Sequence, residues 1–420
     1  MPQNINEWLT WIKNYHDQAI NYDLSNVTLI AAQLQVQCFS VPVITVAGTN
    51  GKGSCIATME AILHAHGIKV AAYTSPHMFN FNERIRINAQ AVSDNDICNA
   101  MQIVQACVAA NANLALSLFE YATLAALVLF KQAQPEVILL EVGMGGRLDA
   151  VNVVANQIAI ITSIALDHCA YLGNTIEAIG FEKAGIVKRN GILIYAEANM
   201  PRSVAVQALE LKATIYQCAK DYNYSEQQNS WGWQFGAKHY HGLSLPAFAV
   251  GNAAAALTAL SLLPTLVLDS SIISKTLTRI KLVGRLQIET YSDREFVFDV
   301  AHNPAAVTWL NAKLKQSVHV GRTLVILGIV ATKDSAAMLQ SWDLPVHKWF
   351  ICAPKTMKRA TPLNKLMDIV QAAQHGIVET AQDVATALKL ALAQTVSGDR
   401  IVIFGSFHTV ADGLNACKRW

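Results

Sequence analysis

A glycine-rich loop with one lysine is the part of the sequence best suited to phosphate chemistry. In ITVAGTNGKGSC, residues 44–55, a β-branched run precedes the loop and a helix-forming run follows it. Glycines at positions 48, 51 and 53 let the backbone approach a ligand closely, and Lys52 adds a positive charge. Backbone N–H groups and the helix N-terminus both attract anions. The loop therefore predicts binding of a nucleotide's phosphates, although Gly53 stands where G-x-x-x-x-G-K-[ST] has a hydroxyl residue.

Three further side chains follow strand-like runs and could hold magnesium. Because the loop lacks the usual hydroxyl, the ion needs other ligands, and Mg²⁺ prefers oxygen atoms. Ser75 lies in YTSPH, Glu141 ends VILLE, and His168 follows IAIITSIA. Each residue alone is more often structural. In open α/β sheets, however, ligands bind beyond the carboxyl ends of the strands, so together the three predict a metal site.

Composition narrows the class of protein. The chain is 52% hydrophobic and 15% charged, which is typical of a folded protein. Its net charge of +2 predicts no nucleic-acid or anionic-membrane surface. Eight scattered cysteines without a C-x-x-C pair, and a start without a signal-peptide pattern, favour a cytoplasmic protein.

One apolar stretch, residues 247–268, has the length of a membrane-spanning helix. Asn252 and Pro264 interrupt it, and no basic flank sets an orientation. A buried helix starting near Asn252 is the better interpretation, so we expect no membrane association.

Apolar strand-like runs alternate with helical patterns along most of the chain, which is typical of a parallel α/β sheet. Residues 5–35 have helical spacing, and the polar, aromatic residues 221–242 predict an antiparallel hairpin. A predicted hinge, KLVGRLQIETYSDRE, precedes five more strand candidates. We predict a doubly wound, mostly parallel P-loop domain over residues 1–284 and a smaller Rossmann-like α/β domain over residues 285–420.

Nine short motifs then resemble those of a known family. They are GTNGKGS, TSPH, LLEVGMGGRLDA, TSIALDH, FEKAGI, GNAAAAL, GRLQ, FDVAHNP and GSFHTVA. Their order is similar to that in folylpolyglutamate synthases and dihydrofolate synthases, which belong to the Mur-ligase superfamily. The resemblance covers about residues 5–413, and SLFEYATLAAL resembles the bifunctional bacterial enzymes.

This resemblance implies roles for individual residues on the nucleotide side. Magnesium would be held by Ser75, Glu141 and His168, and Lys183, carbamylated by CO₂, would help to hold a second ion. The residues implied to bind ATP are Thr49, Asn50, Gly51 and Lys52 on the β- and γ-phosphates, Asn252 on the adenine, Arg285 on the phosphates, and Asp299 on the ribose.

The resemblance also implies the substrate sites and the reaction. ATP would convert a substrate carboxylate to an acyl phosphate, and the amino group of L-glutamate would then attack it. The acceptors would be dihydropteroate and reduced folates. Lys52, Lys183 and His302 are the implied catalytic residues, Ser406 lies near the implied glutamate site, and the implied pterin site consists of Ser117, Phe119, Glu120, Leu148, Asp149 and Ala150.

One departure from the family pattern concerns the first of the two reactions. Bifunctional relatives tend to have Asp-Leu-Gly near residues 20–27, where this chain has INYDLSNV. Asn21 takes the place of that Asp, and Asp23 is its candidate replacement. The alternative is therefore a folylpolyglutamate synthase only.

Three more distant alternatives are a Mur ligase acting on a UDP-linked peptide, a nucleotide-binding regulator without catalysis, and a P-loop kinase. The motifs TSPH, FEKAGI and DVAHNP disfavour the first, and the presence of Lys52, Glu141, His168 and Lys183 disfavours the second. The missing Walker serine disfavours the third. The resemblance favours a monomer that binds only small molecules.

Overall fold

The computed structural model describes residues 2–16, 23–111, 114–357, 359–373 and 376–418. The chain forms two compact units. The first comprises Met1–Ile164 and Leu172–Ile280, and the second comprises Ala165–Tyr171 and Lys281–Trp420. The roles assigned to the predicted domains, 1–284 and 285–420, remain predictions.

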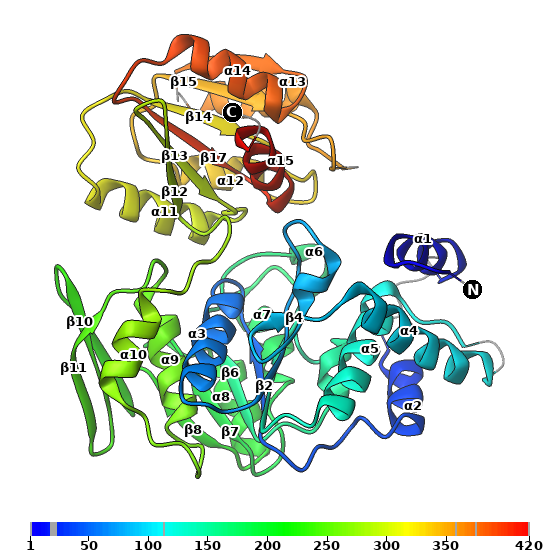
Figure 1. The fold of residues 1–420 in the computed structure, drawn as a ribbon. Helices are drawn as coiled ribbons and strands as arrows, with labels where there is room; N and C mark the ends of the chain where they lie inside the picture. Colours follow the sequence, from blue (N-terminus) through cyan, green and yellow to red (C-terminus); the bar gives the residue numbers. More distant parts are fainter. Residues whose placement is uncertain (1, 17–22, 112–113, 358, 374–375, 419–420) are drawn as a thin grey trace. The chain divides into compact units, whose positions relative to one another are not determined.

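The first unit is built on an eight-stranded sheet in the order β4-β3-β2-β5-β1-β6-β7-β8 (Figure 1). Its centre is parallel and buried on both faces, which explains why these strands are apolar without alternation. Only the edge pairs β2–β3 and β3–β4 are antiparallel. The doubly wound, mostly parallel prediction is confirmed. The strands are β1 (Val43–Ala47), β2 (Val70–Tyr73), β3 (Ile85–Ile87), β4 (Gln90–Ala91), β5 (Val137–Glu141), β6 (Ile158–Ile161), β7 (Ile192–Tyr195) and β8 (Thr214–Gln217).

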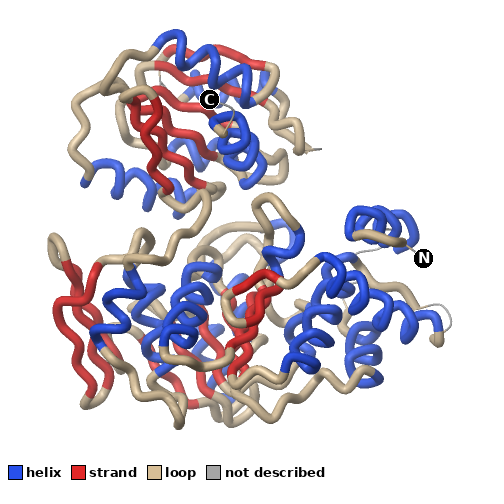
Figure 2. Tube along the Cα trace, viewed as in Figure 1, coloured by secondary structure: helices blue, strands red, loops and turns tan. Residues whose placement is uncertain are grey.

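Helices cover this sheet (Figure 2). On one part of it α3 packs against α9 and α10, and elsewhere α4 packs against α5 and α7 against α8. The helical pattern predicted over residues 5–35 corresponds to two helices, of which one ends at His16 and the next begins at Ser25. The helices are α1 (Ile5–His16), α2 (Ser25–Gln33), α3 (Lys52–Ala65), α4 (Asp94–Ala109), α5 (Leu118–Ala133), α7 (Ile176–Ala184), α8 (Arg202–Glu210), α9 (Val250–Leu260) and α10 (Ser270–Leu277), with 3₁₀ turns η1 (Phe81–Arg84) and η2 (Ala150–Val153); the short α6 (Cys169–Leu172) lies mostly within the residues of the second unit.

The apolar stretch around Asn252 is the buried helix α9, as expected. No helix within the described ranges has the length and apolar character needed to cross a membrane.

A separate antiparallel sheet takes the place of the predicted hairpin. It has three strands rather than two: β9 (Tyr222–Glu226), β10 (Ser230–Phe235) and β11 (Lys238–Ser244). Trp233 is buried, stacks on Tyr240 at 5.5 Å, and donates its indole N–H to Thr258 of α9. The aromatic residues of this segment therefore anchor it to the first unit.

The second unit has a six-stranded sheet in the order β12-β13-β17-β14-β15-β16. The five predicted strands are all present and parallel, and β12, within the predicted hinge, is an additional antiparallel edge. The Rossmann-like prediction is confirmed. The elements are β12 (Gln287–Tyr291), β13 (Arg294–Asp299), α11 (Pro304–Gln316), β14 (Thr323–Leu327), α12 (Ser335–Gln340), β15 (Lys348–Cys352), α13 (Leu363–Ala372), β16 (Ile377–Ala381), α14 (Val384–Gln394), β17 (Arg400–Phe404) and α15 (Phe407–Cys417).

Candidate active site

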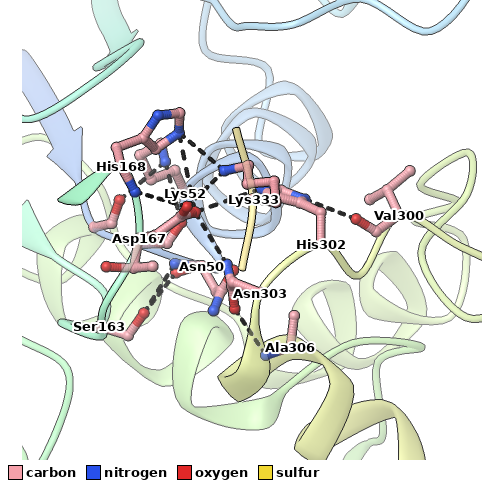
Figure 3. A network of polar contacts seen from close by, with 12 residues as sticks. Asn50, Lys52, Ser163, Asp167, His168, Val300, His302, Asn303, Ala306 and Lys333 are labelled. Atoms are coloured by element: carbon pink, nitrogen blue, oxygen red, sulfur yellow. Dashed lines mark hydrogen bonds and ion pairs between the residues drawn. The ribbon is translucent and has the colours of Figure 1, made fainter. Parts of the chain in front are cut away.

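The glycine loop connects the buried strand β1 to helix α3 and is held by the strand next to it. Thr49 donates its backbone N–H to the Ser163 carbonyl at 2.8 Å, and Asn50 donates its own to the Ser163 hydroxyl at 3.0 Å (Figure 3). Gly48 has a φ of +151°, and a Cβ there would lie 1.9 Å from the Thr162 hydroxyl. Only glycine fits this turn, so the loop's shape is set by its packing against residues 162–163.

Lys52 is the first residue of α3, and its amine folds back over the loop. Its Nζ donates to the Gly48 carbonyl at 2.9 Å and contacts the Thr49 carbonyl at 3.4 Å. The N–H groups of a helix's first turn have no intrahelical acceptors, and this end of the helix is partly positive. The lysine and the helix N-terminus therefore present positive charge at the same loop, where a phosphate would bind.

Asn252, in the first turn of α9, borders the loop directly. Gly51 has a φ of +89°, and a Cβ on it would lie 2.4 Å from the Asn252 side-chain oxygen. A side chain at position 51 would thus be strained and would also displace the asparagine. The amide of Asn252 is consequently placed beside the loop.

Ser75 and Glu141 come together, as expected for residues at the ends of neighbouring strands β2 and β5. The Ser75 N–H donates to Glu141 Oε2 at 3.1 Å, and the carboxylate is buried. Both of its oxygens lie 3.8 Å from where a Cβ of Gly53 would be. A buried carboxylate and a neighbouring hydroxyl beside the phosphate loop have the oxygen donors that a divalent cation needs.

His168 does not belong to that pair within the first unit. It lies in residues 165–171, which belong to the second unit, and it has a φ of +52°. Among the described residues, no group of three or more His, Cys, Asp or Glu side chains could hold a metal. The role of His168 as a ligand remains a prediction.

The loop after β5 is organised by Asp149. Its buried carboxylate accepts backbone N–H groups from Gly143, Met144 and Val151 at 2.9, 3.0 and 3.1 Å. Burial raises the pKa of Asp149 to about 6, and these hydrogen bonds and the charge of Lys52 oppose that rise only in part. Asp149 therefore shapes the backbone around the predicted pterin site.

Other predicted pterin-site residues begin helix α5. Ser117 and Glu120 form a capping box, in which each side chain accepts the other residue's backbone N–H. The Phe119 ring lies 6.0 Å from that of Tyr73, and a Cβ on Gly143 would come within 2.7 Å of it. Phe119 thus lies beside the Asp149 loop, whereas Ser117 and Glu120 have a structural role in starting the helix.

The remaining first-unit residues differ in their environments. Lys183 is 3% exposed in α7, Ala150 is buried, and Leu148 is 39% exposed. Asp23 is exposed, and its carboxylate accepts the backbone N–H and the hydroxyl of Ser25 at 2.9 and 2.7 Å. Asn21 lies outside the described residues.

In the second unit, charged side chains converge on Asp167 (Figure 3). Lys333 donates to Asp167 Oδ1 at 2.6 Å, and the side-chain amide of Asn303 donates to Oδ2 at 3.2 Å. His302 Nε2 lies 3.6 Å from Oδ2, and its Nδ1 lies 2.8 Å from the Val300 carbonyl. Lys333 Nζ is also 3.2 Å from His168 Nε2.

These neighbouring side chains change the pKa of Asp167. Burial alone would raise its pKa, but the His302 hydrogen bond and the charges of Lys333, His302 and His168 hold the pKa well below the usual range. Sequence reasoning missed Asp167 and Lys333. The available signal was their position, directly before His168 and in the loop after β14.

Arg285 and Asp299 also lie near one another in the second unit. The Arg285 guanidinium carbon is 5.2 Å from the centre of the Phe407 ring. Asp299 accepts the N–H groups of Leu286 and Ala301 at 2.7 and 2.8 Å. Burial raises the pKa of Asp299, and the charge of Arg285 opposes this. Asp299 therefore positions the chain segment that carries Arg285.

Ser406 is a helix cap. Its hydroxyl accepts the Thr409 N–H at 3.0 Å and lies 2.7 Å from the Thr409 hydroxyl. It is buried, so its observed contacts are structural. A role toward glutamate remains a prediction.

A phosphate loop on a parallel sheet followed by a second α/β unit is the arrangement of a nucleotide-dependent ligase of the Mur type. Residues 46–260 match the Mur ligase middle domain, and residues 284–407 match the Mur ligase glutamate ligase domain.

Known proteins narrow the class further. The dihydrofolate synthase/folylpolyglutamate synthase of Escherichia coli K12 is 38% identical over 404 residues, covering 96% of this chain and 93% of its own. The structure of E. coli FolC in complex with DHPP and ADP superposes with a TM-score of 0.92 at 36% identity, covering 100% of this chain and 99% of its own. A bifunctional folylpolyglutamate synthase/dihydrofolate synthase with Mn, AMPPNP and L-glutamate bound has a TM-score of 0.90 at 36% identity, covering 99% and 98%.

The chain therefore belongs to the Mur ligase family and, within it, to the dihydrofolate synthase/folylpolyglutamate synthases. It is an ATP-dependent ligase.

Proposed function

We propose that this ligase adds L-glutamate both to dihydropteroate and to reduced folates. The observation that carries the proposal is the match to bifunctional enzymes along 96% of the chain, with a phosphate-binding loop at the centre of the matching sheet. The relatives were solved with ADP or AMPPNP, and one with Mn and L-glutamate. ATP, a divalent cation and glutamate are accordingly the small molecules we assign to this chain.

The residues of the glycine loop would hold the β- and γ-phosphates. The Lys52 amine is already held over the loop by two carbonyl oxygens. When a phosphate binds, the amine would exchange these neutral acceptors for a charged one. Asn252, beside Gly51, is the proposed adenine contact. Arg285 and Asp299 are the proposed contacts of the second unit with the nucleotide.

Ser75 and Glu141 are the proposed magnesium ligands of the first unit, and His168 is the third. Two ions are expected. When bound, such ions neutralise charge on a transferring phosphoryl group. The buried Glu141 carboxylate next to the Ser75 N–H supports this assignment.

Lys183 is the proposed carbamylated lysine. Its burial in α7 of the first unit, which also carries the phosphate loop, supports this assignment. Incubation with ¹³C-bicarbonate should give a carbamate NMR signal that Lys183→Arg lacks. No signal in the wild-type protein would overturn the assignment.

The chemistry follows from the poor reactivity of a carboxylate toward amines. A substrate carboxylate oxygen attacks the γ-phosphorus of ATP, and ADP leaves. The amino group of glutamate then attacks the acyl carbon, loses a proton, and expels inorganic phosphate. Lys52 would stabilise charge on the transferring phosphoryl group. Lys183 and His302 complete the proposed catalytic set, and Ser406 is the proposed contact with glutamate.

The proposed pterin site is the region of Phe119 and Asp149. The Phe119 ring borders Gly143, and the backbone N–H of Gly143 donates to the Asp149 carboxylate. Ser117, Glu120, Leu148 and Ala150 flank the region, and Asn21 and Asp23 are the proposed dihydropteroate contacts. A phenylalanine ring there would stack on the pterin.

The first experiment is phosphate release from ATP with Mg²⁺ and L-glutamate. Dihydropteroate, tetrahydrofolate and no acceptor should be compared. Release with both acceptors supports the bifunctional assignment and shows that Asn21 is tolerated. Release with tetrahydrofolate alone identifies a folylpolyglutamate synthase only, and release with neither contradicts the folate assignment. We further propose a cytoplasmic monomer that binds neither nucleic acid nor membrane.

A further inference from the structure

The second unit contains a cavity of about 560 Å³ at the amino ends of three strands of its sheet. Its lining includes Thr323 at the start of β14, His347 just before β15, and Arg400 at the start of β17. His302 and Ser406 follow the carboxyl ends of β13 and β17. Five strand residues at roughly 3.3 Å each separate the two edges of the sheet. The cavity is therefore distinct from the proposed glutamate region.

The charged residues that line this cavity are all basic, and the lining includes no acid. They include Lys315, Arg322 and Arg400, together with His319 and His347. The carboxylates that neutralise the arginines lie outside the lining: Arg322 Nη2 contacts Asp399 Oδ2 at 2.7 Å, and Arg400 contacts Glu295. The arginines therefore belong to the lining, whereas Asp399 and Glu295 do not.

Arg400 has a guanidinium nitrogen that is not used in a hydrogen bond within the part of the protein that the structure describes. Its side chain is 4% exposed, its Nε donates to Glu295, and its Nη2 donates to the Ser317 hydroxyl at 2.8 Å. The remaining nitrogen, Nη1, makes no hydrogen bond with any residue that the structure describes. Since a guanidinium is always charged and carries five N–H donors, an anion in the cavity would satisfy donors that the protein leaves unused.

Two further cationic groups can reach the same ligand. Lys315 pairs with Asp343 at 2.5 Å, but both side chains are more than half exposed. Such a pair contributes little, so the lysine can turn to another anion. Arg322 and His347 also belong to the lining, and Arg322 Nη1 lies 3.4 Å from His347 Nε2. Several cations favour a ligand with more than one negative charge.

Apolar side chains complete the wall. Leu314, Leu344, Pro345 and Val346 belong to the lining. We propose that this cavity binds a small polyanion, with two or more carboxylate or phosphate groups, at a site separate from the ligase centre. The proposal does not depend on the ligase substrates.

The test is isothermal titration calorimetry of the full chain at low ionic strength, with inorganic pyrophosphate and citrate as probes. Ser317→Asp places a carboxylate next to Arg400, and Lys315→Glu reverses a charge in the lining. Lys313→Glu, on the same helix but outside the lining, is the matched control. Lys52→Ala removes the lysine of the phosphate loop, so binding that persists in it belongs elsewhere.

At least one probe should bind saturably, with a Kd below about 1 mM. Ser317→Asp and Lys315→Glu should each weaken that binding about tenfold or more, while ligase turnover and thermal unfolding stay near wild type. Lys313→Glu should bind as the wild type does, and in Lys52→Ala the binding that Ser317→Asp weakens should remain. Binding of pyrophosphate alone identifies a phosphate ligand, and binding of citrate alone a polycarboxylate. No saturable heat with either probe, or binding lost only in Lys52→Ala, would overturn the proposal.

Discussion

Two aspartates with little exposed side chain, one in each unit, are held by opposite means. Asp149 accepts three backbone N–H groups from its own loop, and burial raises its pKa to about 6. Asp167 faces Lys333, His302 and Asn303, and its pKa is held far below the usual range despite burial. At Asp167 the His302 hydrogen bond and the charges of Lys333, His302 and His168 outweigh the cost of burial, whereas at Asp149 three backbone N–H groups and the charge of Lys52 do not.

The difference also separates two ways of building a site. The region of Asp149 is shaped by backbone and by neighbours close in sequence, so a motif can reveal it. The cluster at Asp167 brings together side chains that are far apart in the chain. His302 is 135 residues and Lys333 is 166 residues away from Asp167. Such a cluster depends on charge balance, and the loss of one member should be costly.

The largest expected effect is that of Asp167→Asn on the second unit. It leaves the ammonium of Lys333, whose side chain is only 10% exposed, without its anion, and breaking a pair with so little exposure costs about 3–5 kcal/mol. Hydrogen–deuterium exchange of the β13 and β14 amides should report this loss. Adding Lys333→Met should restore part of it. A single variant as stable as the wild type would contradict the buried-pair interpretation.

Next in size is the effect of Lys52→Ala on turnover. Removing one charged donor from the transferring phosphoryl group should lower phosphate release about 10²–10³-fold. Lys52 also lowers the pKa of Asp149, so the variant should move that pKa further up. The control is Lys275→Ala, an exposed lysine on α10. Equal turnover in both variants would remove Lys52 from the catalytic set.

The pH dependence of stability should distinguish the two aspartates by sign. Because the folded-state pKa of Asp149 is raised, its contribution is present below about pH 4 and is lost as pH rises through about 6, by up to about 3 kcal/mol. Asp167 has a lowered pKa, so its contribution is present above about pH 4 and is lost on acidification. Urea unfolding of the wild type, Asp149→Asn and Asp167→Asn from about pH 2 to about pH 7 gives both differences, that of Asp149 between about pH 4 and 6 and that of Asp167 below about pH 4. Parallel curves for the two variants would refute the contrast.

The smallest effect belongs to Asp343→Asn. Its pair with Lys315 is as short as 2.5 Å, but both side chains are more than half exposed. The cost should be below about 1 kcal/mol, because water and salt screen exposed charges. Measured by the same exchange experiment as Asp167→Asn, it tests whether burial or charge pairing sets the size of the effect.

The sequence predicted the central strands of both sheets and the edge strand β16, but missed the other edge strands. Strands buried on both faces are apolar throughout, as in β1, β5 and β17, and so are visible as short hydrophobic runs. The missed strands β8 and β12 lie at sheet edges and have only partly buried or exposed residues. Because β12 has no apolar run, the sequence predicted a hinge there instead of a strand.

By itself, the sequence determined the phosphate loop, the alternation of strands and helices, and the family. Glycines at 48 and 51 and Lys52 are local in the chain, so their spacing carries the information. Only the tertiary structure decided that Asn252 borders Gly51 and that Lys333 pairs with Asp167. The tertiary structure also brings together the basic residues that line the cavity, which come from α11 and from the starts of three strands. The physical reason is that burial and charge pairing depend on which distant segments meet, and no local pattern records that.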